Sequence, residues 1–200
     1  MISILHISDT HGMHREMHSL PYADIIVHSG DFCREGHEEE VIDFIEWFDT
    51  LEYNHKIFVA GNHDDYLHNA QIDGLPENMH YLCYSALNIE GINFYGIPMF
   101  SADIISKKYQ KQILEIPNNI DILITHQPPF GILDQTTNKH YGDIDILNKV
   151  CTIKPKFHLF GHVHNNNGII EDTTTFINSA MSDEKYQLKQ KYHILNYQTP

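Results

Sequence analysis

The sequence lacks the features that mark a membrane-spanning or disulfide-stapled protein. No apolar run approaches the roughly 20 residues needed to cross a bilayer. The opening stretch, MISILHISDTHG, contains neither a basic segment nor a small-residue cleavage site. Only three cysteines are present, Cys33, Cys83 and Cys151, and none forms a CxxC pair. These absences predict that the protein has no signal peptide and no membrane span. They also predict that it works in the reducing cytoplasm.

Basic residues are also scarce. The chain has 13 Lys and Arg against 27 Asp and Glu, which gives a formal net charge of −14. A protein that grips extended nucleic acid needs a basic surface, so this balance argues against such a partner. A small phosphate ester remains compatible with the charge, because bound cations can reverse the local field. The sequence does not indicate an oligomeric state.

What is present indicates one globular α/β domain over residues 1–200. The 200 residues, of which 42% are hydrophobic, suffice to bury a core without disulfides. Short apolar runs predict strands at 2–7, 24–28, 56–60, 121–125 and 157–160. Turn signals at Glu90-Gly91 and Asp172-Thr173 predict two antiparallel hairpins, and a last strand is expected at 192–197.

Helical patterns separate several of these strands. Val41, Phe44, Ile45 and Phe48 follow the i, i+3, i+4, i+7 spacing of an amphipathic helix. Further helices are expected over 102–115 and 143–150. Strands that alternate with helices, together with hairpins, predict two packed mixed β-sheets flanked by helices.

Polar clusters directly follow five of the apolar runs. In chain order they are Asp9-Thr10-His11, Gly30-Asp31, Gly61-Asn62-His63-Asp64, Thr125-His126 and Gly161-His162-Val163-His164. Each cluster alone is weak, since Gly-Asp is an ordinary turn and a single histidine is most often a polar loop residue. As a set they are informative, because ligands of α/β sheets bind outside the carboxyl ends of the strands.

The chemistry of the set is that of a metal site. Carboxylates and imidazoles without thiolate suit Mn, Fe or Zn. Asp-x-His and His-x-His place both side chains on the same side of an extended backbone. One aspartate can bridge two cations, and cations about 3.5–4 Å apart can activate water and clamp an in-line displacement at phosphorus.

This order of motifs resembles that of the calcineurin-like metallophosphoesterase superfamily over Asp9 to His164. Ile7-Ser8-Asp9-Thr10-His11 and His28-Ser29-Gly30-Asp31-Phe32 further resemble the brain-type metallophosphoesterase-domain branch. That branch is associated with metal-dependent phosphodiesterase activity, including activity on cyclic nucleotides. Both histidines of the last motif are present, and members of the branch that lack one lose activity.

The resemblance implies a role for each matching residue. A first cation would be held by Asp9, His11, Asp31 and His164. A second would be held by Asp31, Asn62, His126 and His162, with Asp31 as the bridge. The favoured cation is Mn, with Fe and Zn as alternatives. The nucleophile would be a metal-bound hydroxide, His63 would contact the phosphate or protonate the leaving oxygen, and Asp64 would orient His63.

One departure from the superfamily narrows the function. Protein phosphatases of this group carry Gly-Asp-x-x-Asp-Arg-Gly, whereas residues 30–36 here read GDFCREG. The missing Asp-Arg pair argues against a protein phosphatase. Arg34 could contact the substrate phosphate, or it could form a surface salt bridge with one of the residues 38–40.

The leading prediction is a phosphodiesterase for a small, nucleotide-like phosphate ester. The alternatives are a phosphomonoesterase or a nuclease on the same site, or an interaction scaffold with little catalysis. The intact His63-Asp64 pair speaks against the scaffold, which would not need it.

Overall fold

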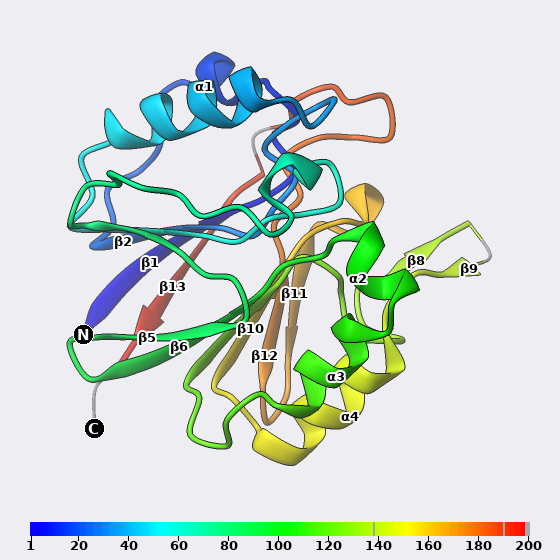
Figure 1. The fold of residues 1–200 in the computed structure, drawn as a ribbon. Coiled ribbons are helices and arrows are strands. Elements are labelled where there is room, and N and C mark those ends of the chain that lie inside the picture. Colours follow the sequence, from blue (N-terminus) through cyan, green and yellow to red (C-terminus); the bar gives the residue numbers. More distant parts are fainter. Residues whose placement is uncertain (138, 190, 199–200) are drawn as a thin grey trace.

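The computed structural model describes residues 1–137, 139–189 and 191–198, and these form four layers (Figure 1). Two β-sheets face each other, and helices cover both outer faces. The first sheet has the order β13-β1-β2-β3-β4 and the second has the order β11-β12-β10-β7-β6-β5. The predicted fold class, two mixed sheets flanked by helices, is confirmed.

The strands of the two sheets agree with the predicted runs to within a few residues, except that β4 was not predicted. The first sheet contains β1 (Ile2–Ile7), β2 (Ile25–His28), β3 (His55–Phe58), β4 (Met79–Tyr81) and β13 (His193–Tyr197). The second contains β5 (Ser85–Ile89), β6 (Ile92–Ile97), β7 (Ile122–Thr125), β10 (Phe157–Phe160), β11 (Gly168–Glu171) and β12 (Thr175–Asn178). A small separate hairpin pairs β8 (Gln135–Thr136) with β9 (Lys139–His140).

Parallel pairing dominates the centre of each sheet. Strands β1 to β4 run parallel in sequence order, and β13 joins β1 antiparallel. In the second sheet β6, β7, β10 and β12 are parallel, while β5 and β11 add the two predicted hairpins at the edges. The parallel strands of each sheet therefore end at the same edge, which gathers the loops that follow them.

Three apolar clusters hold the layers together. Residues of both sheets, among them Ile4, Val27 and Leu159, form the core between the sheets. Phe44 and other residues of helix α1 (Glu38–Asp49) cover the outer face of the first sheet. The outer face of the second sheet is covered by the helices α2 (Ser101–Ile105), α3 (Lys108–Leu114) and α4 (Ile144–Ile153). Because both faces of the central strands are covered, those strands read as continuous apolar runs.

Two helix predictions need correction. The single helix expected over 102–115 is wrong: Lys107 adopts a left-handed conformation (φ +62°) that separates α2 from α3. Just before the break, the buried carboxylate of Asp103 accepts hydrogen bonds from Tyr84 at 2.7 Å and His68 at 3.0 Å, so tertiary contacts override helix propensity. The helix expected over 143–150 starts one residue later, because the Asp143 carboxylate caps it, and it extends to Ile153.

Three short 3₁₀ turns complete the description: η1 (His14–Glu16), η2 (Asp65–Leu67) and η3 (His164–Asn166). In the described part of the chain, no helix combines the length and the apolar character that a bilayer crossing requires.

Candidate metal centre

The loops after five parallel strands converge at one place, beyond the carboxyl ends of the strands of both sheets. Ligand atoms of the types that bind metals lie within 4.8 Å of one another in three overlapping groups. The groups are Asp9, His11 and His164; His11, Asp31 and His63; and Asp31, His126 and His162. The structure therefore brings together six of the seven residues expected as ligands, with His63 beside them.

Asp31 lies between the other ligand residues. Its Oδ2 atom is 3.2 Å from Nε2 of His126 and 3.9 Å from Nε2 of His11. On one side of this arrangement, Oδ1 of Asp9 is 3.3 Å from Nε2 of His164. The Asp31 carboxylate is thus close to histidines on both sides of the site, which is the position that a bridging carboxylate needs.

The backbone at these positions is strained. Asp9, His11, Asp31 and His162 all have positive φ, between +44° and +68°. Such conformations cost of order 1–3 kcal/mol each and persist only where the surroundings enforce them. Here the backbone N–H of Asp9 donates to the Gly30 carbonyl at 2.9 Å, and that of His11 donates to the Asp31 carbonyl at 3.0 Å. This left-handed backbone conformation directs the side chains at the strand ends toward the site.

Two glycines allow the carboxylates to approach the neighbouring backbone. A Cβ atom on Gly61 would overlap the carboxylate of Asp31, and a Cβ atom on Gly161 would overlap that of Asp9. The N–H of His162, one residue after Gly161, donates to the Asp9 carboxylate at 3.0 Å. The glycines of the Gly-Asn-His-Asp and Gly-His-Val-His motifs are therefore required by close packing around the acids.

Backbone carbonyls orient three of the imidazole rings. Nδ1 of His126 donates to Ser29 at 2.9 Å, Nδ1 of His164 donates to Asp183 at 3.0 Å, and Nδ1 of His11 donates to Cys33 at 3.2 Å. Each contact places the proton on Nδ1 and turns the lone pair of Nε2 toward the centre, which is the arrangement usual for metal-bound histidine.

Two buried polar atoms that could bind a metal have no hydrogen-bond partner among the described residues. They are Oδ1 of Asn62 and Nε2 of His126. Buried polar atoms are nearly always paired, so such atoms need an explanation. A divalent cation would satisfy both, and the donor set of carboxylate, amide and imidazole fits one.

Comparisons with known proteins agree with this geometry. Residues 2–166 match the sequence model of the calcineurin-like phosphoesterases. The chain belongs to this family. Members are divalent-metal-dependent hydrolases of phosphoesters, so membership supports a phosphoester hydrolase here.

Relatives and solved structures extend the likeness over nearly the whole chain. Metallophosphoesterase domain-containing protein 1 of Homo sapiens is 32% identical, across 97% of this chain and 70% of its own length. A UPF0046 protein of Caenorhabditis elegans is 34% identical, across 97% of this chain and 79% of its own length. One solved structure has a TM-score of 0.64 at 16% identity, covering 96% of this chain and 94% of that one. Another, GAP50, the anchor in the inner membrane complex of Plasmodium, has a TM-score of 0.52 at 14% identity, covering 96% and 76%. These two structures show the fold alone.

The electrostatics of this phosphoesterase centre pair acids with histidines. Burial alone would raise the pKa of Asp31, but the neighbouring His126 outweighs it and the pKa of Asp31 is lowered. Burial likewise opposes the charged form of His126, and Asp31 raises its pKa above the ordinary value. Burial lowers the pKa of His11 and of His162 to about 4, which keeps these two rings neutral and able to donate a lone pair.

Asp64 does not orient His63, so that prediction is wrong. The Asp64 carboxylate is buried and accepts the backbone N–H groups of Asp31, Cys33 and Gly61 at 2.7–2.8 Å. Nδ1 of His63 instead donates to a carbonyl, that of Arg34, at 2.7 Å. Burial, followed by repulsion from Asp31, raises the pKa of Asp64 to about 7. Through these hydrogen bonds, Asp64 connects the loop after β2 with the loop after β3.

The Arg34 side chain is largely exposed. It is 66% accessible, and the nearest carboxylate is that of Glu35, at 3.9 Å from Nε. The expected salt bridge to residues 38–40 is wrong, because Glu40 accepts the backbone N–H of Arg34 at 2.8 Å rather than its side chain. A substrate contact by Arg34 stays a prediction.

Sequence reasoning missed Tyr186. Its ring centroid lies 4.7 Å from that of His11, 5.7 Å from that of His164 and 6.0 Å from that of His63. The tyrosine stands alone in a polar segment with no periodicity, so no pattern marked it. The Asp at 183, a strong turn former, was the one available signal that this segment folds back tightly.

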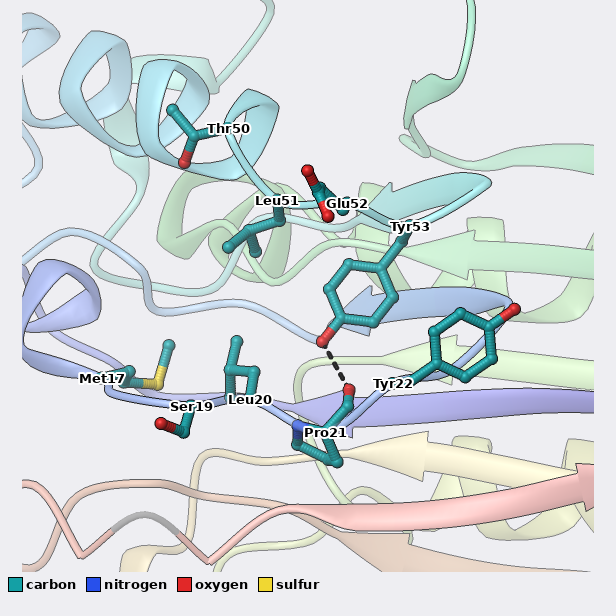
Figure 2. A pocket seen from close by; sticks show the side chains of 9 residues that line it. All are labelled: Met17, Ser19, Leu20, Pro21, Tyr22, Thr50, Leu51, Glu52 and Tyr53. Atoms are coloured by element: carbon teal, nitrogen blue, oxygen red, sulfur yellow. Dashed lines mark hydrogen bonds between the residues drawn. The ribbon is translucent and has the colours of Figure 1, made fainter.

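A hollow elsewhere in the molecule lies apart from this chemistry. It has a volume of about 350 Å³ and lies between the segment before β2 and the end of α1 (Figure 2). Its lining includes Met17, Leu20 and Tyr53, and the Tyr53 hydroxyl donates to the Pro21 carbonyl at 2.8 Å. It contains none of the expected ligands and borders the amino-terminal end of β2, whereas the metal centre lies beyond the carboxyl end.

Proposed function

We propose that the protein is a phosphodiesterase that hydrolyses a small, nucleotide-like phosphate ester with the help of two divalent cations. Manganese is the favoured cation, with iron and zinc as alternatives. The first cation would be held by Asp9, His11, Asp31 and His164, and the second by Asp31, Asn62, His126 and His162. The observation that supports this most strongly is the position of Asp31, whose carboxylate lies within 4 Å of imidazoles from both groups.

Cations bound at these residues supply activation of water and neutralisation of the phosphate charge. The chain itself supplies the proton to the leaving oxygen. Nδ1 of His63 is fixed on the Arg34 carbonyl, and the ring lies edge-on to His11 with centroids 4.8 Å apart. Because Nδ1 donates to this carbonyl, Nε2 can give up a proton only from the imidazolium form of the ring, so we assign the imidazolium of His63 as the general acid.

Asp64 contributes indirectly to this proposed mechanism. By accepting the N–H groups of Asp31 and Gly61, its carboxylate fixes the backbone of the bridging aspartate relative to the loop that carries Asn62 and His63. Asp64 is thus a positioning residue for both cations.

The same metal-binding residues suit a phosphomonoesterase or a nuclease. These alternatives differ from the proposed function in the substrate, which is a phosphate monoester or a nucleic acid. A net charge of −14 disfavours a long nucleic acid and favours a small substrate. A pure scaffold would not need three overlapping donor groups or the strained backbone that assembles them.

We also propose that residues 1–200 act as one domain and that the protein works in the cytoplasm. The core shared by both sheets supports the first statement. The second is supported by the three free cysteines, Cys33, Cys83 and Cys151, which suit a reducing compartment.

The test is a paired measurement of metal content and ester turnover. Protein loaded with Mn is assayed against bis(p-nitrophenyl) phosphate and p-nitrophenyl phosphate. We expect diester turnover with about two cations per chain, and we expect Asp31→Ala to abolish both. Preference for the monoester would favour the phosphomonoesterase, and bound metal without turnover of either ester would contradict the proposal.

A matched control separates a site effect from a general loss of charge. Asp172 is an exposed acid in the turn between β11 and β12, distant from the metal centre. Asp172→Ala should retain both metal and activity. His63→Ala should keep the metal and lose most of the rate. Loss of the metal in that variant would make His63 a ligand instead of the acid.

A further inference from the structure

We infer that the loop of residues 181–189, together with Tyr141, forms the recognition wall for the organic group of the ester, and that this group is a flat ring. The inference rests on the proposed function, because it takes the metal centre as the place where the phosphate binds. It assigns a role to a C-terminal segment that no metal ligand occupies.

The 181–189 loop is fastened to the end of β1, beside the metal centre. The N–H of Met181 donates to the Ser8 carbonyl at 2.8 Å, and the Ser182 hydroxyl donates to the Asp9 carbonyl at 2.7 Å. The other end returns to the same point, since the N–H of Lys189 donates to the Met181 carbonyl at 2.6 Å. Both ends of the loop are therefore fixed next to a proposed ligand.

Asp183 shapes the loop into a tight turn. Its carboxylate accepts the N–H groups of Lys185 and Gln187, both at 2.9 Å, and pairs with the Lys189 ammonium at 2.9 Å. Its carbonyl accepts the N–H of Tyr186, also at 2.9 Å. Tyr186 itself is left-handed, with φ +57°, a conformation that an ordinary surface residue rarely adopts. The turn is built so that the Tyr186 ring is turned toward the histidines of the centre.

A hollow of about 240 Å³ lies between this loop and the segment that follows the β8–β9 hairpin. Figure 1 shows the loop, in orange, and the hairpin extending on the same side of the molecule. The hollow is bordered by Tyr141, Val163, Glu184 and Tyr186, next to His162 and His164. Tyr141 and Tyr186 are 39% and 38% exposed. The Lys139 ammonium lies 4.7 Å from the Tyr141 ring centroid, so Tyr186 offers the more open ring surface. A phosphate on the metal centre would direct its organic substituent into this hollow.

The lining selects the chemistry of that substituent. Tyrosine rings attract other flat rings through stacked or edge-to-face contacts. The charges at the border are mixed, with the Glu184 carboxylate on one side and the Lys139 ammonium over the Tyr141 ring on the other, so the rings and not the charge select the substituent. The substrate class is therefore a phosphate ester of an aryl or nucleobase-bearing group, rather than a purely aliphatic ester.

The test compares two stable probes that share one head group. Phenylphosphonate and methylphosphonate are titrated calorimetrically into the Mn-loaded protein. We expect phenylphosphonate to bind about tenfold more tightly. Tyr186→Ala should remove most of that preference, read as the ratio of the two affinities within the same variant, and Tyr186→Phe should keep it because the ring remains.

Tyr22→Ala is the matched control, because Tyr22 is 78% exposed and borders the separate hollow of Figure 2. It should leave both affinities unchanged. Equal affinity of the unmodified protein for the two probes, no binding of either, or a preference that survives Tyr186→Ala would overturn the inference. The probes are not hydrolysed, so failure of diester turnover strikes the proposed function alone.

Discussion

The two groups of candidate ligands are held in different ways. In the group of Asp31, His126 and His162, the ring of His126 is fully buried and is oriented by the Ser29 carbonyl, which directly follows a parallel strand of the first sheet. In the group of Asp9, His11 and His164, the side chain of His164 is 12% exposed and is oriented by the carbonyl of Asp183 in the 181–189 loop. One group is anchored on the sheets, and the other depends on a surface turn.

From this difference we infer that the two proposed cations are bound with unequal affinity. Ligands oriented from within packed sheets are preorganised, whereas a ligand held by a loop loses its orientation whenever the loop opens. We therefore expect the cation near His126 to bind more tightly than the cation near His164.

The largest expected effect is on metal binding, in two single variants that each remove one histidine ring, one from each group. His126→Ala should weaken the sheet-anchored cation by more than about 100-fold, since even residues that only orient a ligand are worth 10- to 100-fold. His164→Ala should weaken the other cation and leave the sheet-anchored one in place. Metal analysis after gel filtration reports the number retained, and loss of both cations from His164→Ala would remove the distinction between the groups.

Release by a chelator should follow the same order. We expect Mn to leave the unmodified protein in two steps, of which the faster belongs to the group anchored on the loop. His164→Ala should lack the faster step. Stopped-flow mixing with a chromogenic chelator measures both rates, and a single step in the unmodified protein would contradict the prediction.

A smaller effect is expected from the loop anchor itself. Ser182→Ala removes the hydroxyl that donates to the Asp9 carbonyl, at a cost of about 1 kcal/mol in folding stability. It should also weaken the loop-anchored cation by up to about tenfold. Ser101→Ala, at an exposed position that starts α2, is the matched control. Urea unfolding and Mn titration of both variants check the prediction, and an equal effect at the two serines would contradict it.

A separate effect, on stability rather than on metal binding, concerns the acid sensitivity of the sheets that hold the group of Asp31, His126 and His162. His158 in β10 is fully buried, and burial lowers its pKa to about 3 from the ordinary 6.5. The unfolded chain then binds a proton that the folded chain does not, so the stability present above pH 6.5 is lost as the pH falls toward about 3. At pH 5 the loss from this ring is about 2 kcal/mol.

His158→Leu should flatten that part of the profile, because the variant has no ring to protonate. The Thr125 hydroxyl, which contacts the ring at 2.9 Å, keeps its bond to the Gln127 carbonyl. Urea unfolding of the metal-free protein at pH 7.5 and pH 5 gives the difference. An unchanged pH dependence in the variant would show that His158 is not the group responsible.

The fold and the gathering of the donors were predictable because each rests on a local pattern. Parallel strands buried on both faces produce apolar runs, and the residue that follows each run must lie at the carboxyl edge of a sheet. Asp9 after β1 and His126 after β7 could therefore be placed together, although 117 residues separate them. The break at Lys107 could not be foreseen, since Asp103 is bound by side chains from distant segments.

The parts that escaped prediction depend on contacts with backbone atoms. Asp64 follows His63 in the motif, yet its carboxylate turns away to three N–H groups of other loops. Tyr186 reaches His11 from a segment 175 residues further along the chain. Neither contact leaves a periodic trace, because loop geometry with positive φ follows no repeating spacing.

The carbonyl of Asp183 accepts two hydrogen bonds, one from the ring of His164 and one from the N–H of Tyr186. The same oxygen atom therefore sets both a metal donor and the wall that would contact the substrate. Altering this loop to admit a different substrate will also change how firmly the cation is retained. Under the proposed assignments, selectivity and metal retention would be coupled traits, so selection or engineering for one would alter the other.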